Sequence, residues 1–464
     1  MFPTAAALTV DSIRDCLEGF IPSAIATCAA DGTPNVTYVS QVDYVDREHV
    51  ALSFQFFNKT RENILANPYA TVYVINPMTG QAYSLSLHYL RTEHSGRLFE
   101  RMKVKLAGIA AHSGMTGIFK LQGADIYQVQ AIEKVPVAAL PPMPPRALLT
   151  ALRHGCEQLQ QCNDVACLLD ETLALLACGF GIEQSMILLV DEVGKRLYTV
   201  ASHGYAAAGI GWEIPVGEGL IGLAAAHHIP VRIAFKTSEY AYGQAIRQNL
   251  TEAGRGNELA AEIPFPGLPA SESQMAIPIL SGTQLLGVLF VESEQPCRFS
   301  YDDEDALVTL TRQLGMLLQQ ILQAGCDETD PASIPNAAEL ATASKATGAE
   351  NSAATPGVPV VLQHYPENDI IFLDDNYLIK GVAGAILWKL VSCHQSSGRD
   401  EFSNRELRLD PAIGLPELSD NLEARLILLA RRLAERCDYL AIEKTGRGRF
   451  RLRVDRPLQL RSGH

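Results

Sequence analysis

Short runs of β-branched and aromatic residues, separated by polar turns, fill most of the first 135 residues. Segment 21–46 carries such residues on both sides of Asp31–Gly32, a pair that favours a tight hairpin turn. Short helices are predicted at 58–67 and 95–110. Further strand-like runs follow at 49–57, 69–77, 80–94 and 124–135. Six or so short strands with few helices predict a small β-barrel.

The next region changes to the apolar spacing of helices. Segments 146–162 and 165–180 repeat apolar residues at i, i+3 and i+4. A strand hairpin at 185–205 and a loop, short helix and strand at 212–233 come next. A second hairpin at 274–293 and a long helix at 299–322 complete the region. This order predicts an α+β sandwich.

The last hundred residues combine short strands with three predicted helices. Ser403 and Glu406 have the spacing of a capping box that opens the second helix. The third helix carries one apolar stripe, formed by Leu422, Leu426, Leu429 and Leu433. A different face, with Arg425 and Arg432, is expected to point cationic groups outward. A basic strand–turn–strand hairpin follows at 439–454.

Two breaks divide the chain. Four prolines between 141 and 145 exclude a helix there, and 327–359 is rich in Ala, Ser, Thr, Pro, Gly and Asn without an aromatic residue. We therefore predict domains at 1–135, 146–322 and 360–456, with 327–359 as a flexible linker.

The net charge of −14 is unevenly distributed. Residues 141–322 hold 10 basic and 20 acidic side chains, a net of −10. Residues 425–461 hold 11 basic and 4 acidic side chains, a net of +7. The chain is therefore no uniformly basic nucleic-acid coat, and a basic module attached to an acidic sensor is the expected organisation.

No apolar run has the roughly 18 residues that a membrane helix needs, and no secretory leader is evident. A cytoplasmic protein with reduced thiols is expected. Four cysteines lie in segments predicted to be helical, at spacings of 6, 5 and 11 residues: Cys156, Cys162, Cys167 and Cys178. These spacings differ from the C-x2-C pairs of cluster sites. Buried thiols are favoured over a redox or metal role, which stays open, and no metal site is predicted.

The first domain resembles the FMN-binding split barrels of the pyridoxamine-phosphate-oxidase-like group. The resemblance rests on IATCAADGTPNV (25–36), SFQFF (53–57), KTRENILANP (59–68) and TVYVINPMTG (71–80). It implies that polar and cationic groups at the start of the helix bind the flavin phosphate, as a helix N-terminus favours. These residues are Ser53, Gln55, Lys59, Thr60, Arg61 and Asn63. A barrel that has lost its cofactor, or one that binds another planar ligand such as haem or deazaflavin, fits the same residues. The chain lacks the Arg- and Trp-bearing tail of the true oxidases, which argues against catalysis.

The second domain resembles a GAF domain. The segments that carry the resemblance are 216–233, 275–293 and 299–318. GAF domains are sensing or dimerising modules whose ligands vary widely, so the resemblance does not name a ligand.

The third domain looks like the winged helix-turn-helix output domains of bacterial response regulators. LLARRL (428–433) and GRGRF (446–450) match the end of the third helix and the wing. The resemblance places Asn421 and Arg425 at base edges of duplex DNA. Contacts to the DNA backbone are implied for Arg431, Arg432, Lys444, Arg447 and Arg449.

Together these features predict a multidomain α+β chain: a split β-barrel, a GAF sandwich and a C-terminal winged helix. The expected function is a cytoplasmic one-component transcriptional regulator, not an enzyme. It would sense a small effector, flavin or redox state, bind DNA as a homodimer, and have no membrane contact. The alternatives are a flavin-dependent oxidoreductase with appended regulatory domains and an interaction scaffold whose modules have lost their ligands.

Overall fold

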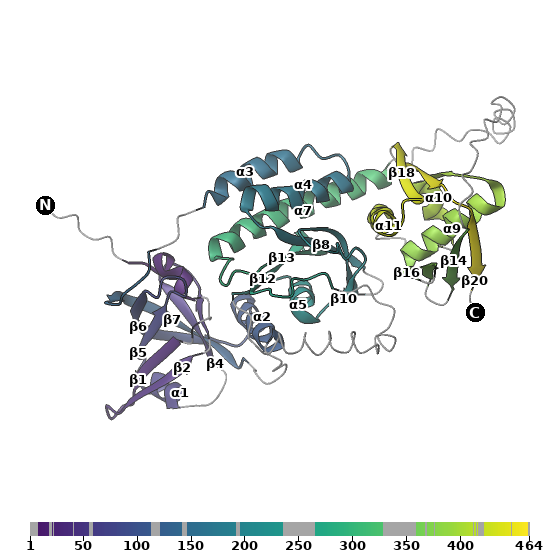
Figure 1. The fold of residues 1–464 in the computed structure, drawn as a ribbon. Coiled ribbons are helices and arrows are strands. Elements are labelled where there is room, and N and C mark those ends of the chain that lie inside the picture. The colour runs from purple at the N-terminus through teal and green to yellow at the C-terminus, as the bar shows by residue number, and fades with distance from the viewer. Residues whose placement is uncertain are drawn as a thin grey trace.

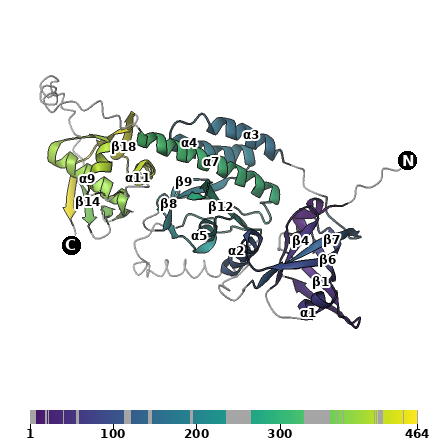
Figure 2. The ribbon, with the colours of Figure 1, turned by 180° about the vertical axis from the view of Figure 1, so that it is seen from behind.

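The computed structural model describes residues 8–462 except 18–20, 22, 40, 55–58, 113–120, 142–145, 192–194, 235–264, 328–358, 367–368, 375, 412, 414, 416–421 and 447. The predicted linker therefore lies almost entirely outside the described residues. Three folded regions follow one another in chain order, with the central one between the other two (Figures 1 and 2). Within the described residues, no helix is both long and apolar enough to cross a membrane.

The N-terminal region is a curled antiparallel sheet of seven strands in the order β2-β1-β5-β6-β7-β4-β3. Alternate residues such as Ile25, Val72 and Leu85 fill its inner face. The strand-like segment after the Asp31–Gly32 turn forms two strands rather than one. The strands are β1 (Ser23–Cys28), β2 (Pro34–Val39), β3 (Val42–Tyr44), β4 (His49–Phe54), β5 (Tyr69–Ile75), β6 (Ala82–Glu93) and β7 (Gly123–Val135).

Three helical segments accompany this sheet: η1 (Val10–Leu17), α1 (Lys59–Ala66) and α2 (Arg97–His112). Helix α2 reaches away from the sheet and packs on the central region (Figure 1). Its Val104 is buried in the central region's apolar cluster with Ile221 and Val231. The first two domains therefore share a core element.

The central region is a six-stranded antiparallel sheet in the order β10-β9-β8-β13-β12-β11, covered on both faces. Its helices are α3 (Leu148–Leu159), α4 (Val165–Phe180), α5 (Gly219–His227) and α7 (Tyr301–Asp327). Its strands are β8 (Gln184–Asp191), β9 (Arg196–His203), β10 (Glu213–Pro215), β11 (Val231–Ile233), β12 (Ser273–Ser281) and β13 (Gln284–Ser293).

The two faces of this sheet have separate apolar clusters. Ile187 and Leu189 of β8 pack in the cluster that contains α3, α4 and α7 residues. Met186 and Leu188 of the same strand pack with α5 and α2. Burial on both faces explains why the central strands have continuous apolar runs in place of strict alternation.

The C-terminal region has two small sheets and three helices. One sheet has the order β16-β15-β14-β20, with β14 and β20 parallel, and the other has the order β17-β19-β18. The helices are α9 (Val382–Ser397), α10 (Asn404–Leu409) and α11 (Leu422–Arg436). The strands are β14 (Val360–Tyr365), β15 (Ile370–Leu373), β16 (Asn376–Ile379), β17 (Glu401–Ser403), β18 (Leu440–Gly446), β19 (Arg449–Val454) and β20 (Leu458–Ser462).

Several local predictions for this region are confirmed. Ser403 caps α10, and its Oγ accepts a hydrogen bond from the Glu406 amide at 3.3 Å. The apolar stripe of α11 is buried in full, and β18 pairs with β19 as the predicted hairpin. Strand β20 lies beyond the predicted domain end at residue 456 and completes the first sheet.

Candidate functional site

The predicted flavin site surrounds the first turn of α1, where polar side chains bond to one another. Asn35 Nδ2 donates to Thr60 Oγ1 at 2.9 Å, and Asn63 Nδ2 donates to Thr27 Oγ1 at 3.1 Å. Thr60 and Asn63 are buried. These bonds attach α1 to β1 and β2. The Thr60 hydroxyl and the Asn63 amide, both predicted flavin ligands, are therefore already hydrogen-bonded within the domain.

Arg61 lies at the centre of a second polar group. Its guanidinium forms an ion pair with Asp125, donates to Thr92 Oγ1 at 2.9 Å and covers the Phe54 ring at 4.2 Å. Burial opposes the charge, but the pairing with Asp125 raises the pKa of Arg61 above its ordinary value. The charge of Arg61 is therefore already neutralised by a protein carboxylate.

The remaining predicted ligands are placed as follows. Ser53 Oγ accepts from the Gln41 amide at 3.2 Å, and Gln55 lies outside the described residues. Lys59 keeps an exposed ammonium group, 3.6 Å from Glu62. An incoming phosphate would thus meet Lys59 at the amino end of α1, and Arg61 would reach it only by leaving Asp125. The described residues fit a phosphate group in part.

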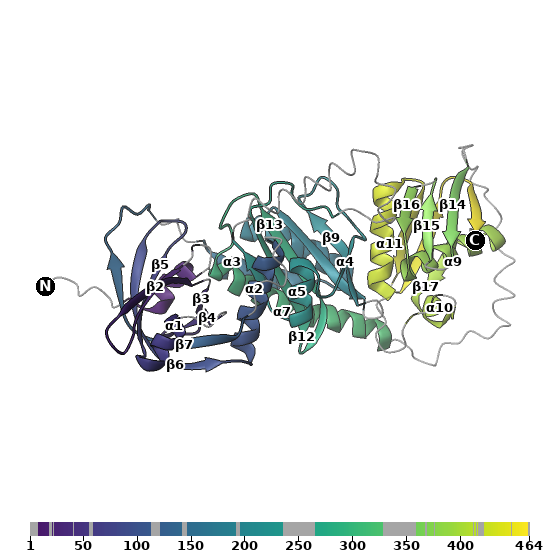
Figure 3. The same ribbon diagram turned by 90° about the horizontal axis from the view of Figure 1, so that it is seen from below.

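The second candidate site is α11 with the β18–β19 hairpin. Helix α11 contacts β9 and α4 of the central region, and Figure 3 shows it between that region and the C-terminal sheet. The predicted DNA ligands on α11 that the structure describes, Arg425, Arg431 and Arg432, therefore face protein.

Arg425 is buried, with 11% of its side chain exposed. Its guanidinium pairs with Asp191 at 2.9 Å and lies 4.3 Å from the centre of the Tyr198 ring. Burial works against the charge, yet Tyr198 and Asp191 raise the pKa of Arg425. The expectation that this face points outward is wrong for Arg425, because β8 and β9 cover it.

Arg432 is buried for another reason. It donates from Nε to the Leu378 carbonyl oxygen at 2.9 Å and pairs with Glu435 at 2.9 Å. Burial and the nearby charge of Arg436 lower its pKa. Its expected outward orientation is also wrong, since it holds α11 against β16 within its own domain.

Of the other predicted DNA ligands, Arg431 and Lys444 pair with carboxylates of the central region. Arg431 pairs with Asp170 at 2.7 Å and donates to the Val200 carbonyl oxygen at 3.0 Å. Lys444 of β18 pairs with Asp164 at 3.1 Å. Arg449 of β19 is exposed, whereas Asn421 and Arg447 lie outside the described residues.

Cys156, Cys162, Cys167 and Cys178 do not meet as a group, and the prediction that they are buried is wrong for Cys167 and Cys178, which are exposed. Cys162 and Cys167 lie together, with 3.0 Å between their sulfur atoms, while Cys156 and Cys178 form no such contact within the described residues. Burial, followed by the hydrogen bond from Cys167, raises the pKa of Cys162 to about 12. No set of three metal-ligating side chains occurs in the described part of the chain.

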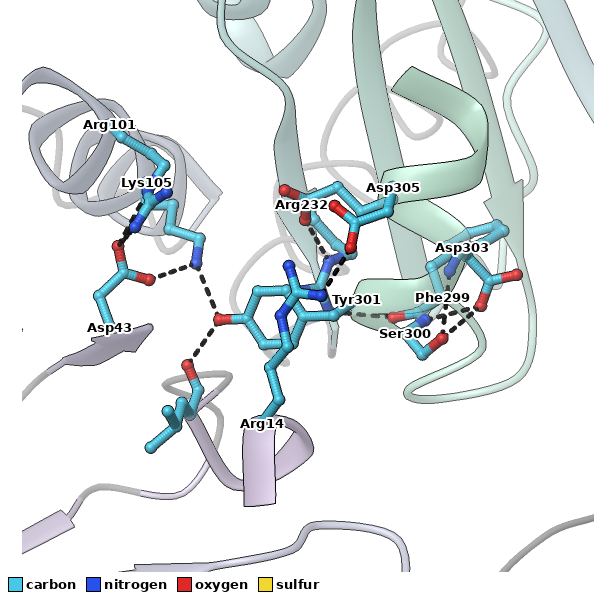
Figure 4. A network of polar contacts seen from close by, with 12 residues as sticks. Arg14, Asp43, Arg101, Lys105, Arg232, Phe299, Ser300, Tyr301, Asp303 and Asp305 are labelled. Atoms are coloured by element: carbon cyan, nitrogen blue, oxygen red, sulfur yellow. Dashed lines mark hydrogen bonds and ion pairs between the residues drawn. The ribbon is translucent and has the colours of Figure 1, made fainter. Parts of the chain in front are cut away.

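Sequence reasoning missed the residues at the junction of the first two domains. Tyr301, at the start of α7, has Arg14 on its ring at 4.5 Å and Arg232 at 4.4 Å (Figure 4). Its hydroxyl donates to the Leu17 carbonyl oxygen at 2.9 Å and lies 3.4 Å from Lys105 Nζ. These residues come from four distant segments, so no local pattern marks them. We call Arg14, Asp43, Arg101, Lys105, Arg232 and Tyr301 the Tyr301 cluster.

Asp43 anchors α2 in this cluster. It accepts from Lys105 at 2.9 Å and from Arg101 at 3.1 Å. Although burial opposes ionisation, the charges of Lys105 and Arg101 hold the pKa of Asp43 below its usual range. Burial likewise opposes the charge of Lys105, but Asp43 raises its pKa above the usual range. Both partners are thus held in their charged forms.

Comparisons with known proteins identify two of the three regions. The family model described as pyridoxamine 5'-phosphate oxidase matches residues 9–149, and the GAF domain model matches residues 164–318. The chain therefore contains a pyridoxamine-phosphate-oxidase-like N-terminal domain followed by a GAF domain. None of the curated proteins matches it.

Solved structures resemble single domains of the chain. The GAF domain of an Acinetobacter phosphoenolpyruvate-protein phosphotransferase is 23% identical over 39% of this chain and 97% of its own, with a TM-score of 0.30. Free methionine-R-sulfoxide reductase from Neisseria meningitidis is 21% identical over 40% and 99%, with a TM-score of 0.30. An FMN-binding protein from Syntrophomonas wolfei is 14% identical over 28% and 86%, with a TM-score of 0.24.

Proposed function

We propose that this chain, in which a pyridoxamine-phosphate-oxidase-like domain and a GAF domain precede a basic C-terminal domain, is a one-component DNA-binding regulator. The first two domains act as the sensor, and the C-terminal domain binds duplex DNA. The proposal includes no catalytic step.

The observation that carries the proposal is the order and charge of the C-terminal elements. Helices α9, α10 and α11 are followed by the β18–β19 hairpin, which is the order of a helix-turn-helix with a wing. Residues 425–461 have a net charge of +7 in a chain of net −14. A basic end on an acidic chain favours a polyanionic partner.

In the proposed complex, α11 enters the major groove and the hairpin contacts the DNA backbone. Arg425 is the residue that reads a base, because a guanidinium can bond to both acceptors of a guanine edge. Lys444 and Arg449 act on phosphates, which adds affinity without sequence preference.

Selection of bound fragments from a genomic DNA pool by the intact chain tests the proposal, followed by fluorescence anisotropy over a salt series. Binding should weaken steeply with salt, and Lys444→Ala or Arg449→Ala should each reduce the slope of log K against log salt by about one. Arg97→Ala, which removes an exposed arginine of the first domain, is the matched control. If the intact chain enriches no DNA and shows no salt-dependent binding, the proposal is wrong.

A flavin in the first domain is a second candidate function, favoured by the pyridoxamine 5'-phosphate oxidase match. The residues that would hold the phosphate are Lys59 and, after it leaves Asp125, Arg61. A bound flavin would supply redox chemistry, and on that basis an oxidoreductase is the alternative to a sensor.

Titration of the protein with FMN, followed by flavin fluorescence, tests this candidate. Lys59→Ala should weaken binding. Asp125→Asn should strengthen it, because that change releases the Arg61 guanidinium from its carboxylate. Lys103→Ala, at an exposed lysine on α2, is the control. Absence of saturable binding at tens of micromolar FMN, in both the wild type and Asp125→Asn, would exclude a flavin.

A homodimer is also part of the proposal, and the exposed apolar residues of the first domain support it. Val36 and Tyr38 of β2 are 69% and 78% exposed, and Tyr69 of β5 is 61% exposed. Exposed large apolar side chains gathered on one sheet are typical of contact surfaces. Light scattering should give twice the 50.4 kDa chain mass, and Tyr38→Lys should lower it.

A further inference from the structure

The GAF domain presents acidic side chains to the same cations that the proposed function assigns to DNA. Arg425 pairs with Asp191, and Arg431 pairs with Asp170. Lys444 pairs with Asp164. A fourth pair joins Lys380, next to β16, with Glu213 of β10 at 3.2 Å. We call Asp164, Asp170, Asp191 and Glu213 the acidic face.

The acidic face is assembled from separate elements of one domain. Asp164 caps α4 and Asp170 lies six residues further along that helix, while Asp191 ends β8. Each carboxylate has its cation within 3.2 Å. The complementarity agrees with the net charge of −10 over residues 141–322. The acidic face and the basic helix are therefore electrostatically complementary, which favours their association.

The contact also has an apolar part. Leu426 and Leu428 of α11 are buried, and they belong to one continuous apolar cluster that includes Tyr198 and Val200 of β9. Arg425 is buried over Tyr198, where the ring and Asp191 replace water around its charge. A helix seated in this way on β9 and α4 is not available to a DNA groove.

We propose that the acidic face is an internal competitor for DNA, which holds α11 closed until the GAF domain or its neighbour releases it. The inference rests on the proposed DNA-binding function. Carboxylates and DNA phosphates bind the same guanidinium and ammonium groups, so the two partners exclude each other. Of the five predicted DNA ligands that the structure describes, three are held by the acidic face, one is buried in its own domain and Arg449 is exposed.

The closed state lowers the apparent affinity for DNA by the fraction of molecules that are open. Weakening the acidic face should therefore strengthen DNA binding even though no DNA ligand changes. This direction separates the proposal from a purely structural contact, whose loss would leave affinity unchanged or reduce it.

The test uses the full chain with two variants of equal charge. Asp170→Asn with Asp191→Asn removes two carboxylates of the acidic face. Glu171→Gln with Glu183→Gln is the control, because both residues are exposed and neither forms an ion pair within the described part of the chain. The first measurement is anisotropy with a mixed-sequence DNA duplex at about 50 mM salt, where phosphate contacts bind most strongly. The second is hydrogen exchange of α11 without DNA.

We expect the acidic-face variant to bind DNA at least about tenfold more tightly than wild type, since it leaves a buried arginine without its partner. Its α11 amides should exchange faster. The control should match wild type in exchange and gain only the small affinity that two fewer negative charges bring.

Four outcomes are distinct. Faster exchange with at least tenfold tighter binding supports the proposal. Faster exchange with DNA affinity equal to the control overturns it, although DNA binding itself stands. Unchanged exchange also overturns it, because the acidic face then does not hold α11. Faster exchange with no DNA binding by any variant refutes the proposed function, and with it the competition.

Discussion

The two junctions of the GAF domain are crossed by different kinds of contact. At the junction with the first domain, Asp43, Lys105 and Arg232 have 4%, 11% and 1% of their side chains exposed. At the junction with the C-terminal domain, Asp170 is 67% exposed and Lys444 is 55% exposed. The buried pairs at the first junction each lie within one domain, and the contacts that cross it include the buried Tyr301 and Val104 and the pair Arg14–Asp305, whose Asp305 is 61% exposed. The second junction is crossed by ion pairs, of which Arg425 is the most buried cation at 11% exposed.

This difference determines what each junction can do. Separating charges that are buried together is costly, because it leaves an uncompensated charge in a low-dielectric environment. Exposed pairs are weak, salt-dependent and replaceable by any other anion. Because the buried contacts of Val104 and Tyr301 join them, the first two domains are expected to move as one unit, whereas the C-terminal domain can be released from it.

The largest effect is expected at Asp43. Asp43→Ala should lower the free energy of unfolding of the first two domains by about 3–5 kcal/mol, because Lys105 and Arg101 lose the carboxylate that compensates them. Denaturant unfolding measures the loss. Arg47→Gln, which removes a 74% exposed partner of Asp11, should cost less than about 1 kcal/mol. Equal losses in the two variants would show that the Asp43 carboxylate does not compensate buried charges in the Tyr301 cluster.

The pH dependence of the first junction follows from the same pair. The pKa of Asp43 is lowered in the folded state, so its contribution is complete above the ordinary aspartate value of about 4 and is lost as the pH falls through the folded-state value. The pKa of Lys105 is raised, so its contribution is complete below about 10.4 and is lost as the pH rises through the folded-state value. Hydrogen exchange of α2 should therefore be flat between about pH 5 and 9 after correction for the intrinsic rate. A midpoint inside that range would contradict the assignment.

Salt should distinguish the two junctions with a moderate effect. Raising salt from about 0.05 M to about 0.5 M screens exposed charges far more than buried ones. Exchange of α11 should become a few-fold faster, while α2 stays unchanged. If salt changed the exchange rates of α2 and α11 equally, the proposed difference between the two junctions would be wrong.

The smallest effect is expected from Lys444→Ala. Its pair with Asp164 is half exposed, so the stability of the intact chain should change by less than about 1 kcal/mol. Its salt slope for DNA should still decrease, as described above. A stability loss as large as that of Asp43→Ala would mean that the second junction is not replaceable.

The fold was predictable wherever a local pattern exists. The N-cap at Ser403, the stripe from Leu422 to Leu433 and the β18–β19 hairpin are all short-range signals, and each is confirmed. Of the predicted capping box, only the Ser403 half is seen, because the Glu406 carboxylate pairs with Arg399. Strand β20 was not predicted, because it pairs with β14, almost a hundred residues earlier. Because its partner is so distant in sequence, no neighbouring strand and tight turn mark β20 as part of a sheet.

The sites were less predictable, because their partners are remote. Arg61 appears as an exposed cation at a helix start, and only the tertiary fold brings Asp125 to it. Arg425 and Arg432 have the spacing of a solvent-facing stripe, yet β9 covers one and the Leu378 carbonyl holds the other. The resemblance to a DNA-binding domain therefore proposes which arginines could contact DNA, but it does not predict the protein surfaces that these arginines contact in this structure.

Zero-length cross-linking with a carbodiimide tests the account most directly. The reagent joins an amine to a carboxylate that already touch, so Lys444 and Asp164, at 3.1 Å, should become linked in the intact protein. Lys389 and Asp410, at 2.7 Å within the C-terminal domain, provide an internal control. Saturating duplex DNA should abolish the Lys444–Asp164 link and leave the Lys389–Asp410 link in place. If the Lys444–Asp164 link forms equally well on fully DNA-bound protein, the acidic face and DNA do not compete.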